Sequence, residues 1–212
     1  MYRTIFKAIL LIAACISAST SSIAQDFHRN NITAGIGPAI PAGNSSAYLG
    51  AAPLVSVGYG YRFAKLFQAD AGFQIAFGAA RNINPVQTDL GPVQGGDHEF
   101  MIPLGGRLIV PTPFKRIELS AGGGAMYLHY SETAPSNGYY SVSCYSCTSR
   151  GGWGGYGLAN VSYFLDDNHN FHVGTTFQYV SARTNGPPVG NVPAFATSDH
   201  WANLSFELGL SF

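Results

Sequence analysis

Apolar side chains recur at every second position over most of the chain beyond about residue 30. A period of two is typical of β-strands, because successive side chains of a strand point to opposite faces of the sheet. Each alternating segment is also long enough for the roughly 9 to 11 tilted residues with which a strand crosses a bilayer. The pattern predicts eight strands, over residues 30–40, 52–63, 67–79, 98–110, 115–129, 152–165, 170–181 and 200–212.

The links between these strands alternate strictly between short and long. Tight links are expected at residues 64–66, 111–114 and 166–169, and long ones rich in Gly, Pro, Asn and Ser at 41–51, 80–97, 130–151 and 182–199. Barrels in outer membranes have short periplasmic turns and longer external loops. We therefore predict an all-β fold, an eight-stranded antiparallel up-and-down transmembrane β-barrel formed by residues 25–212, with both termini on the periplasmic side.

Residues 1–24 have the features of a secretory signal peptide. Arg3 and Lys7 precede an apolar run from Ala8 to Ile16, and Ser22-Ile23-Ala24 resembles a cleavage site. The apolar run is too short for a membrane-spanning helix, which needs roughly 20 residues. We expect cleavage after Ala24. A lipobox ending at Cys15 is the alternative interpretation of this segment.

Composition supports a barrel whose faces tolerate little charge. Only 10% of the chain is charged and it contains 26 glycines, whereas roughly 25% charged residues are usual in soluble domains. Two of the eleven basic residues and none of the eleven acidic ones precede residue 25, so the remainder carries a formal charge of about −2. No nucleic-acid partner is expected. Composition alone also allows a β-sandwich.

Aromatic residues gather near the ends of the predicted strands, where membrane barrels carry interfacial girdles. A soluble lipocalin-like barrel should instead carry charges at its outward positions. The periplasmic girdle is predicted to contain Tyr61, Phe63, Phe67, Tyr163, Phe171 and Phe212, and the external girdle Tyr127, Trp153 and Tyr179.

The last predicted strand ends in a regular apolar series. Its alternating members are Leu204, Phe206, Leu208, Leu210 and Phe212. A period of two that ends on a terminal phenylalanine resembles the signal by which the barrel-assembly machinery of the outer membrane recognises its clients. The resemblance implies localisation in the cell outer membrane, with that machinery and outer-membrane lipid as partners.

The opposite phase of the strands should line the lumen. Its ionisable members, all in the periplasmic half, are Arg62, Asp70, Arg107, Glu118, His172 and Glu207. Arg107 and Glu118 flank one tight turn and Arg62 and Asp70 another, which predicts cross-strand pairing inside the barrel. The lumen of an eight-stranded barrel is just wide enough to be filled by side chains. A salt-bridged plug is the main interpretation, and a gated path for small solutes is the alternative.

The arrangement of residues 30–212 resembles the small eight-stranded outer-membrane barrels of the OmpA, OmpX and OmpW type. The resemblance rests on the terminal strand from Leu204 to Phe212, on the segment from Val57 to Phe63 before a tight turn, and on the loop rhythm. It implies the architecture and a structural or surface role. A narrow channel and a loop-mediated adhesin are the alternatives, although the lumen is expected to be more polar than a hydrophobic channel of the OmpW type requires.

Cys144 and Cys147 lie in the third long loop, and exported chains form disulfides. We expect a disulfide at the loop tip, with an unpaired dithiol or partial metal site as the alternative. Neighbouring tyrosines and small polar residues could form a contact surface, since aromatic residues are enriched at interfaces. These neighbours are Ser136, Asn137, Gly138, Tyr139, Tyr140 and Tyr145.

Some eight-stranded barrels are lipid-modifying enzymes, and histidines near the external rim make a His-Ser-acid arrangement conceivable. The candidate groups are His98, His129 and His200, with Glu99 and Asp199 as acids. The segment His200-Trp201-Ala202-Asn203 is similar to the His-x-Ser-Asn pattern of the lipid A deacylase family, but alanine replaces the serine nucleophile. We therefore expect no catalytic activity, no cofactor and no metal.

Overall fold

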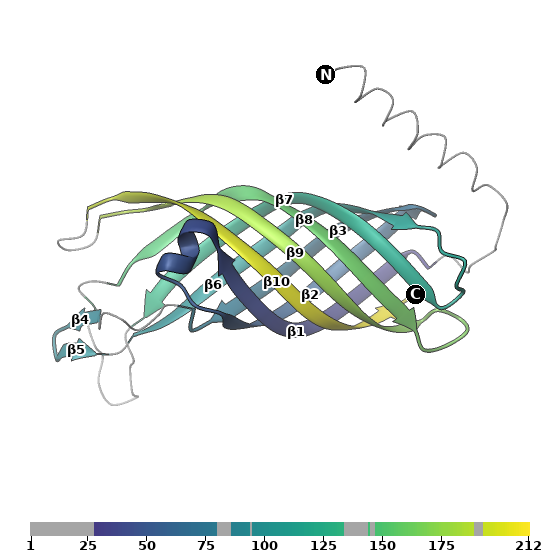
Figure 1. The fold of residues 1–212 in the computed structure, drawn as a ribbon, viewed down its shortest axis with the longest axis horizontal. Coiled ribbons are helices and arrows are strands. Elements are labelled where there is room, and N and C mark those ends of the chain that lie inside the picture. Colours follow the sequence, from purple (N-terminus) through teal and green to yellow (C-terminus); the bar gives the residue numbers. More distant parts are fainter. Residues whose placement is uncertain (1–27, 80–85, 94, 134–143, 145–146, 189–192) are drawn as a thin grey trace, which may run out of the picture.

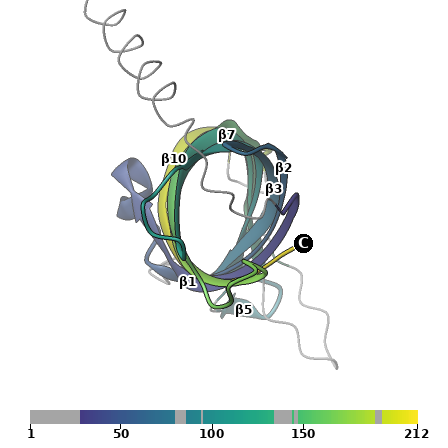
Figure 2. The ribbon, with the colours of Figure 1, turned by 90° about the vertical axis from the view of Figure 1, so that its right-hand side faces the viewer.

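The computed structural model describes residues 28–79, 86–93, 95–133, 144, 147–188 and 193–212. Eight long antiparallel strands form a closed barrel in the order β1-β10-β9-β8-β7-β6-β3-β2 (Figures 1 and 2). They are β1 (Asn30–Ala42), β2 (Ala52–Ala64), β3 (Phe67–Phe77), β6 (Gly96–Val110), β7 (Ile117–Thr133), β8 (Ser149–Phe164), β9 (Phe171–Gly186) and β10 (Phe195–Ser211). The predicted fold class is confirmed, and the expected signal peptide, residues 1–24, lies outside the described residues.

The sheet closes where the first strand pairs with the last. β1 pairs with β2 on one side and with β10 on the other, through partners such as Ala34 with Leu208. At the end of this seam Asn30 N donates to Phe212 O and Phe212 N donates to Asn30 O, both at 2.9 Å. Closure removes the free sheet edges, which would otherwise leave backbone groups unpaired.

At the end of the barrel remote from the C-terminus, which is the predicted external end, six strands extend further than the hydrophobic alternation predicts, and four of them do so by three residues or more. β7 continues to Thr133, β8 begins at Ser149, β9 continues to Gly186 and β10 begins at Phe195. The expected limits were residues 129, 152, 181 and 200. Backbone pairing does not require an apolar face, so these strands remain paired after the alternation of apolar residues has ended. β3, in contrast, ends two residues early, before Gly78, whose φ is +70°.

Two small elements occupy segments that were expected to be irregular loops. A 3₁₀ helix, η1 (Gly43–Ala47), follows β1, and a hairpin of β4 (Val86–Thr88) and β5 (Gly91–Val93) lies between β3 and β6. Both lie toward the end of the barrel opposite the C-terminus (Figure 1). Within the described residues, no helix is long and apolar enough to cross a membrane.

The outward face of the barrel is apolar, in the phase that the sequence predicted. Ile36, Phe206 and Leu208 are 66%, 58% and 67% exposed. The predicted girdle residues Phe63, Phe212 and Trp153 are exposed as well. Since so large an apolar surface is unfavourable in water, the strand faces require a hydrophobic surrounding.

Placing an arginine on this face should destabilise the barrel. Leu208→Arg should lower the free energy of unfolding by roughly 2 to 4 kcal/mol, because a basic side chain near the bilayer midplane loses its hydration. The check is urea unfolding in phospholipid vesicles. Thr133→Arg, at an exposed external strand end, is the control and should change the free energy by less than about 1 kcal/mol. Equal stabilities for wild type and Leu208→Arg would contradict the assigned strand phase.

Candidate functional site: the filled lumen

Two ion pairs cross the periplasmic half of the lumen. The Arg62 guanidinium lies 2.6 Å from a Glu118 carboxylate oxygen, and Arg107 Nε lies 2.8 Å from Asp70 Oδ2. The pairing expected from the tight turns, Arg62 with Asp70 and Arg107 with Glu118, is therefore wrong. Arg62 on β2 instead reaches β7, three strands away in the barrel order.

The position of Gln68 explains why these ion pairs differ from the ones expected across the tight turns. In the strand register Gln68 lies opposite both Arg62 and Arg107. Its Nε2 donates to Asp70 Oδ1 at 2.7 Å and fills the space above Gly60, where an added Cβ would come within 2.1 Å of that nitrogen. The amide thus occupies the position between Arg62 and Asp70, and Arg62 extends across the lumen.

The remaining two predicted lumen groups lie nearby but form no ion pair with these four. Glu207 accepts hydrogen bonds from Ser205 at 2.9 Å and from Asn160 at 3.5 Å. His172 is 4% exposed and packs edge-on against the ring of Phe164, with ring centroids 5.4 Å apart. The six residues therefore share one half of the lumen as two ion pairs and two separately held side chains.

An apolar layer fills the middle of the lumen, which differs from the expectation of a polar interior. Met101, Met126 and Trp201 are fully buried there. The other large members are Leu54, Leu128, Tyr156 and Val180. Met101 has the same strand phase as Arg107, and Trp201 the same phase as Glu207. Extending the inward phase beyond the charged residues would have identified this layer from the sequence.

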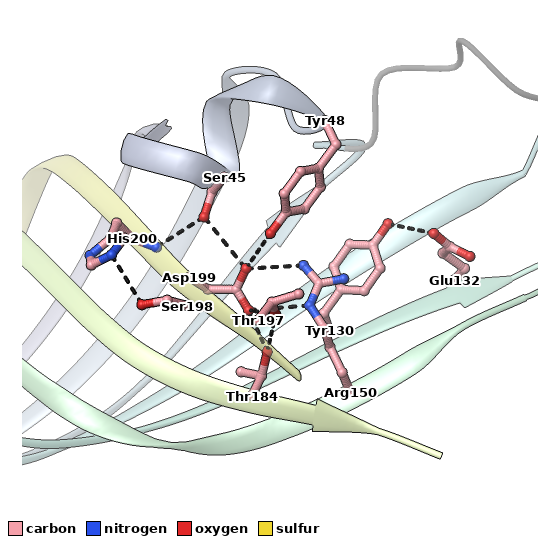
Figure 3. Close-up of polar contacts among 10 residues, drawn as sticks. All are labelled: Ser45, Tyr48, Tyr130, Glu132, Arg150, Thr184, Thr197, Ser198, Asp199 and His200. Atoms are coloured by element: carbon pink, nitrogen blue, oxygen red, sulfur yellow. Dashed lines mark hydrogen bonds and ion pairs between the residues drawn. The ribbon is translucent and has the colours of Figure 1, made fainter. Parts of the chain in front are cut away.

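A second charged layer, which the sequence interpretation did not place in the lumen, closes the external end. Arg150 on β8 is 4% exposed and Asp199 on β10 is fully buried. Arg150 Nε donates to Asp199 Oδ2 at 3.2 Å, and its terminal nitrogen donates to Oδ1 at 3.3 Å (Figure 3). Thr184 and Thr197 hydroxyls also donate to Oδ2 of Asp199, so this carboxylate is satisfied from several strands.

The first external loop is fastened to this layer. Tyr48 donates its hydroxyl to Asp199 Oδ1 at 2.7 Å, and Ser45 of η1 donates to the same oxygen at 3.4 Å (Figure 3). Burial, together with the neighbouring Asp199 carboxylate, raises the pKa of the Tyr48 phenol. The Arg150 guanidinium lies 4.0 Å from the centre of the Tyr130 ring, a cation–π arrangement. The first loop thus packs against the Arg150–Asp199 ion pair at this end of the barrel.

Glu99 is the least satisfied group of this layer. It is fully buried, and neither carboxylate oxygen has a hydrogen-bond partner among the described residues. Asp97 on the same strand face accepts a hydrogen bond from the backbone of Ala79 at 2.9 Å. Four inward carboxylates, Asp97, Glu99, Glu132 and Asp199, therefore lie at this end of the described lumen with a single inward arginine, and removing Arg150 would leave the buried Asp199 carboxylate without its cation.

The spaces left in the lumen are small. A cavity of about 50 Å³ lies between the ion pairs of the periplasmic half and the apolar layer. Its lining includes Gln74, Arg107 and Tyr156. Another, of about 20 Å³, lies near Arg62 and Glu118. A single water needs roughly 10 to 15 Å³ on this measure. Each of these two cavities can hold only a few waters.

The rim histidines do not form a catalytic arrangement with the acids. His200 points outward, and its Nε2 lies 3.2 Å from Ser198 Oγ, whereas Asp199 points into the lumen (Figure 3). His98 and Glu99 are likewise adjacent on one strand and therefore face opposite sides of the sheet. Among the described residues, no group of three His, Cys, Asp or Glu side chains could hold a metal ion.

A disulfide joins Cys144 and Cys147, whose Cα atoms are 5.6 Å apart. Cys144 also forms an antiparallel β-bridge with Thr88 at the end of β4. The third external loop therefore contacts the hairpin of the second. The nearby tyrosines and small residues of the predicted contact surface, 136–140 and Tyr145, lie outside the described residues.

The barrel is similar to solved structures of small outer-membrane proteins. Neisserial surface protein A has 15% sequence identity and a TM-score of 0.54, with 86% of this chain and 97% of that chain covered. A major outer membrane protein from Thermus thermophilus has 12% identity and a TM-score of 0.52, with 87% and 98% covered. OprG from Pseudomonas aeruginosa has 14% identity and a TM-score of 0.50, with 89% and 98% covered.

The fold is that of a small eight-stranded outer-membrane β-barrel. No protein-family model matches the chain, and no curated protein matches its sequence. Similarity at these identities defines the architecture, so the lumen and loops described above must carry any argument about function.

Removing the inward arginine of the external layer should be costly. Arg150→Met should lower the free energy of unfolding by about 3 to 5 kcal/mol, because it leaves the buried Asp199 carboxylate without its cation. Urea unfolding in lipid vesicles measures this loss. Arg116→Met is the matched control, because Arg116 and its partner Asp167 are solvent-exposed in the turns and such pairs contribute little. Similar losses for the two variants would contradict the layer's structural role.

Proposed function

We propose that this protein resides in the outer membrane and forms a closed barrel whose lumen is sealed to solutes, with a structural or surface role. The observation that carries the proposal is the fully buried layer of Met101, Met126 and Trp201 between two charged layers. A polar solute crossing the lumen would have to displace this apolar layer and both sets of ion pairs. Each layer is costly to disrupt.

Membrane placement is supported by the apolar outward face, its aromatic ends and the architecture shared with outer-membrane proteins. Residues 1–24 would direct export as a signal peptide. The series Leu204, Phe206, Leu208, Leu210 and Phe212 would then serve as the signal for the barrel-assembly machinery. Phe212 is 55% exposed, so its side chain is accessible even after its backbone has closed the β1–β10 seam.

We infer that the protein is not an enzyme. The rim histidines and the nearby carboxylates lie on opposite faces of the barrel wall, which separates a possible base from the acid that would orient it. The alternative of a narrow channel through the lower ion pairs would require the apolar layer above them to open.

Planar-bilayer recording of the folded protein purified from membranes tests the sealed lumen. Wild type should give no discrete current steps. Arg107→Ala should be equally silent, because the apolar layer above the removed charge still blocks the path. Circular dichroism and heat-dependent migration on gels would show that each protein inserted as a folded barrel.

Two outcomes would contradict this proposal in different ways. Discrete openings of the wild-type protein would favour a channel. Openings that appear only in Arg107→Ala would place the seal in the lower ion pairs and not in the apolar layer.

A second candidate role, binding by the external loops, is favoured by the paired hairpin of β4 and β5 in the second of them. The hairpin β4–β5 presents Leu90, which is 68% exposed, at its tip, and it contacts the disulfide loop through Thr88 and Cys144. Ordered loops with an exposed apolar tip bind partners with less loss of conformational entropy than disordered ones.

The loop role predicts a specific dependence on the disulfide. Cells that display wild type should adhere to host-matrix proteins or to each other more than cells that display Cys144→Ser/Cys147→Ser, at equal surface levels. Leu90→Ser should reduce adhesion without changing barrel stability. Adhesion that is identical for all three proteins would exclude these loops as the binding surface.

A further inference from the structure

The outward face of the barrel strands carries one arginine and three histidines but no carboxylate. All four basic groups lie near the external end. Every carboxylate of the eight barrel strands belongs to the inward phase. These are Asp70, Asp97, Glu99, Glu118, Glu132, Asp199 and Glu207. The outward groups are Arg183, His98, His129 and His200. A surface that lacks acids and collects basic groups at one level is complementary to an anionic partner at that level.

Arg183 and His200 lie together on the two longest-paired strands. Arg183 on β9 is directly opposite Ser198 on β10, and Ser181 is opposite His200. Directly opposite positions bring Cβ atoms to about 5 Å and diagonal ones to about 7 to 8 Å. We call the outward patch of Tyr179, Arg183, Ser198 and His200 the β9–β10 rim surface.

The His200 ring is held in place within this surface. Its Nε2 lies 3.2 Å from Ser198 Oγ and its Nδ1 3.5 Å from the Tyr179 hydroxyl, and the two aromatic rings stack with centroids 6.3 Å apart. The backbone N–H of His200 donates to Ser45 Oγ of η1 at 3.0 Å (Figure 3). The imidazole is therefore positioned beside Ser198 before any ligand arrives.

The height of the surface along the barrel matches the headgroups of the outer leaflet. Tyr179 belongs to the external girdle, and Arg183 is four residues further out on the same strand. At about 3.3 Å per residue and a tilt near 40°, Arg183 lies about 10 Å beyond Tyr179 along the barrel axis. Below Tyr179 the outward neighbours are apolar, such as Phe177, which is 50% exposed. A lipid could thus place its chains on the apolar wall and its headgroup beside Arg183.

We propose that the β9–β10 rim surface binds the phosphate group of an outer-leaflet lipid. The Arg183 guanidinium can donate two parallel hydrogen bonds to phosphate oxygens, and the Ser198 hydroxyl, which lies against the His200 ring, can add a further donor. This inference rests on the proposed location in the outer membrane. It commits to a lipid-borne phosphate, because the apolar wall directly below the polar groups is of use only to a ligand with acyl chains.

Binding of phosphorylated lipid A to the purified, folded protein in detergent micelles tests the proposal, with native mass spectrometry to count bound lipids. Arg183→Gln should weaken binding about tenfold to a hundredfold, because a charge-assisted bidentate contact is lost. His200→Gln should weaken it a few-fold. Arg116→Gln removes the same charge at the periplasmic turns, and His129→Gln removes a rim histidine that has no arginine beside it on the outward face of β6–β8. Both controls should bind as wild type does.

Two further ligands separate the lipid from other sources of phosphate. Lipid A from which the phosphates have been removed should bind wild type as weakly as the intact lipid binds Arg183→Gln. Inorganic phosphate at millimolar concentration should not compete. Equal binding of Arg183→Gln and Arg116→Gln, or equal binding of dephosphorylated lipid, would overturn the site. Competition by inorganic phosphate would overturn its assignment to a lipid.

Failure of this site is distinguishable from failure of the proposed function. Ion currents through the wild-type barrel would contradict the sealed lumen and leave the lipid-binding measurements intact. Recovery of the protein outside the membrane fraction would contradict the membrane location on which the lipid site depends.

Discussion

Pairing of β1 with β10 closes the sheet, and the rest of the structure depends on this closure. Once the sheet has no edge, the backbone groups of the barrel strands can pair within the wall, and each side chain must point either into a narrow lumen or outward. The outward positions are then free to be apolar. The inward positions must fill a space that leaves little room for unpaired polar groups. Charge content, glycine content and the alternating pattern all follow from this division.

The lumen satisfies the constraint in layers and not with a uniform polar network. Charged residues are confined to two levels where partners from several strands converge, around Arg62 and Arg107 at one level and around Arg150 at the other. Between them the lumen is filled mainly by methionine and leucine side chains, which need no hydrogen-bond partner, and by Trp201, whose indole N–H has none among the described residues. The apolar layer thus separates the ion pairs at one level from the ion pair at the other.

The external layer also links the wall to the loops. Asp199 accepts hydrogen bonds from Tyr48 and Ser45 while it pairs with Arg150, so the first loop is anchored by a residue that points inward. On the next residue, His200, the side chain points outward to the β9–β10 rim surface, which we propose binds a lipid phosphate. Of these two adjacent residues, Asp199 forms contacts inside the lumen and His200 forms contacts on the outward surface. The period of two also places His98 and His200 on the face of the wall opposite to the adjacent acids, Glu99 and Asp199.

The sequence by itself determined the number of strands, their order along the chain and the face on which each side chain lies, because side-chain direction in a strand is local and alternates residue by residue. It also indicated which residues enter the lumen in the periplasmic half. Only the tertiary structure decided which of them meet. Arg62 reaches Glu118 across the lumen because Gln68 occupies the nearer position above Gly60. The external layer around Arg150 and Asp199 was likewise hidden, since there the strands continue by backbone pairing after the apolar alternation has ended. Contacts across a closed barrel depend on register, tilt and the space that glycines leave, and none of these is set by neighbours in sequence.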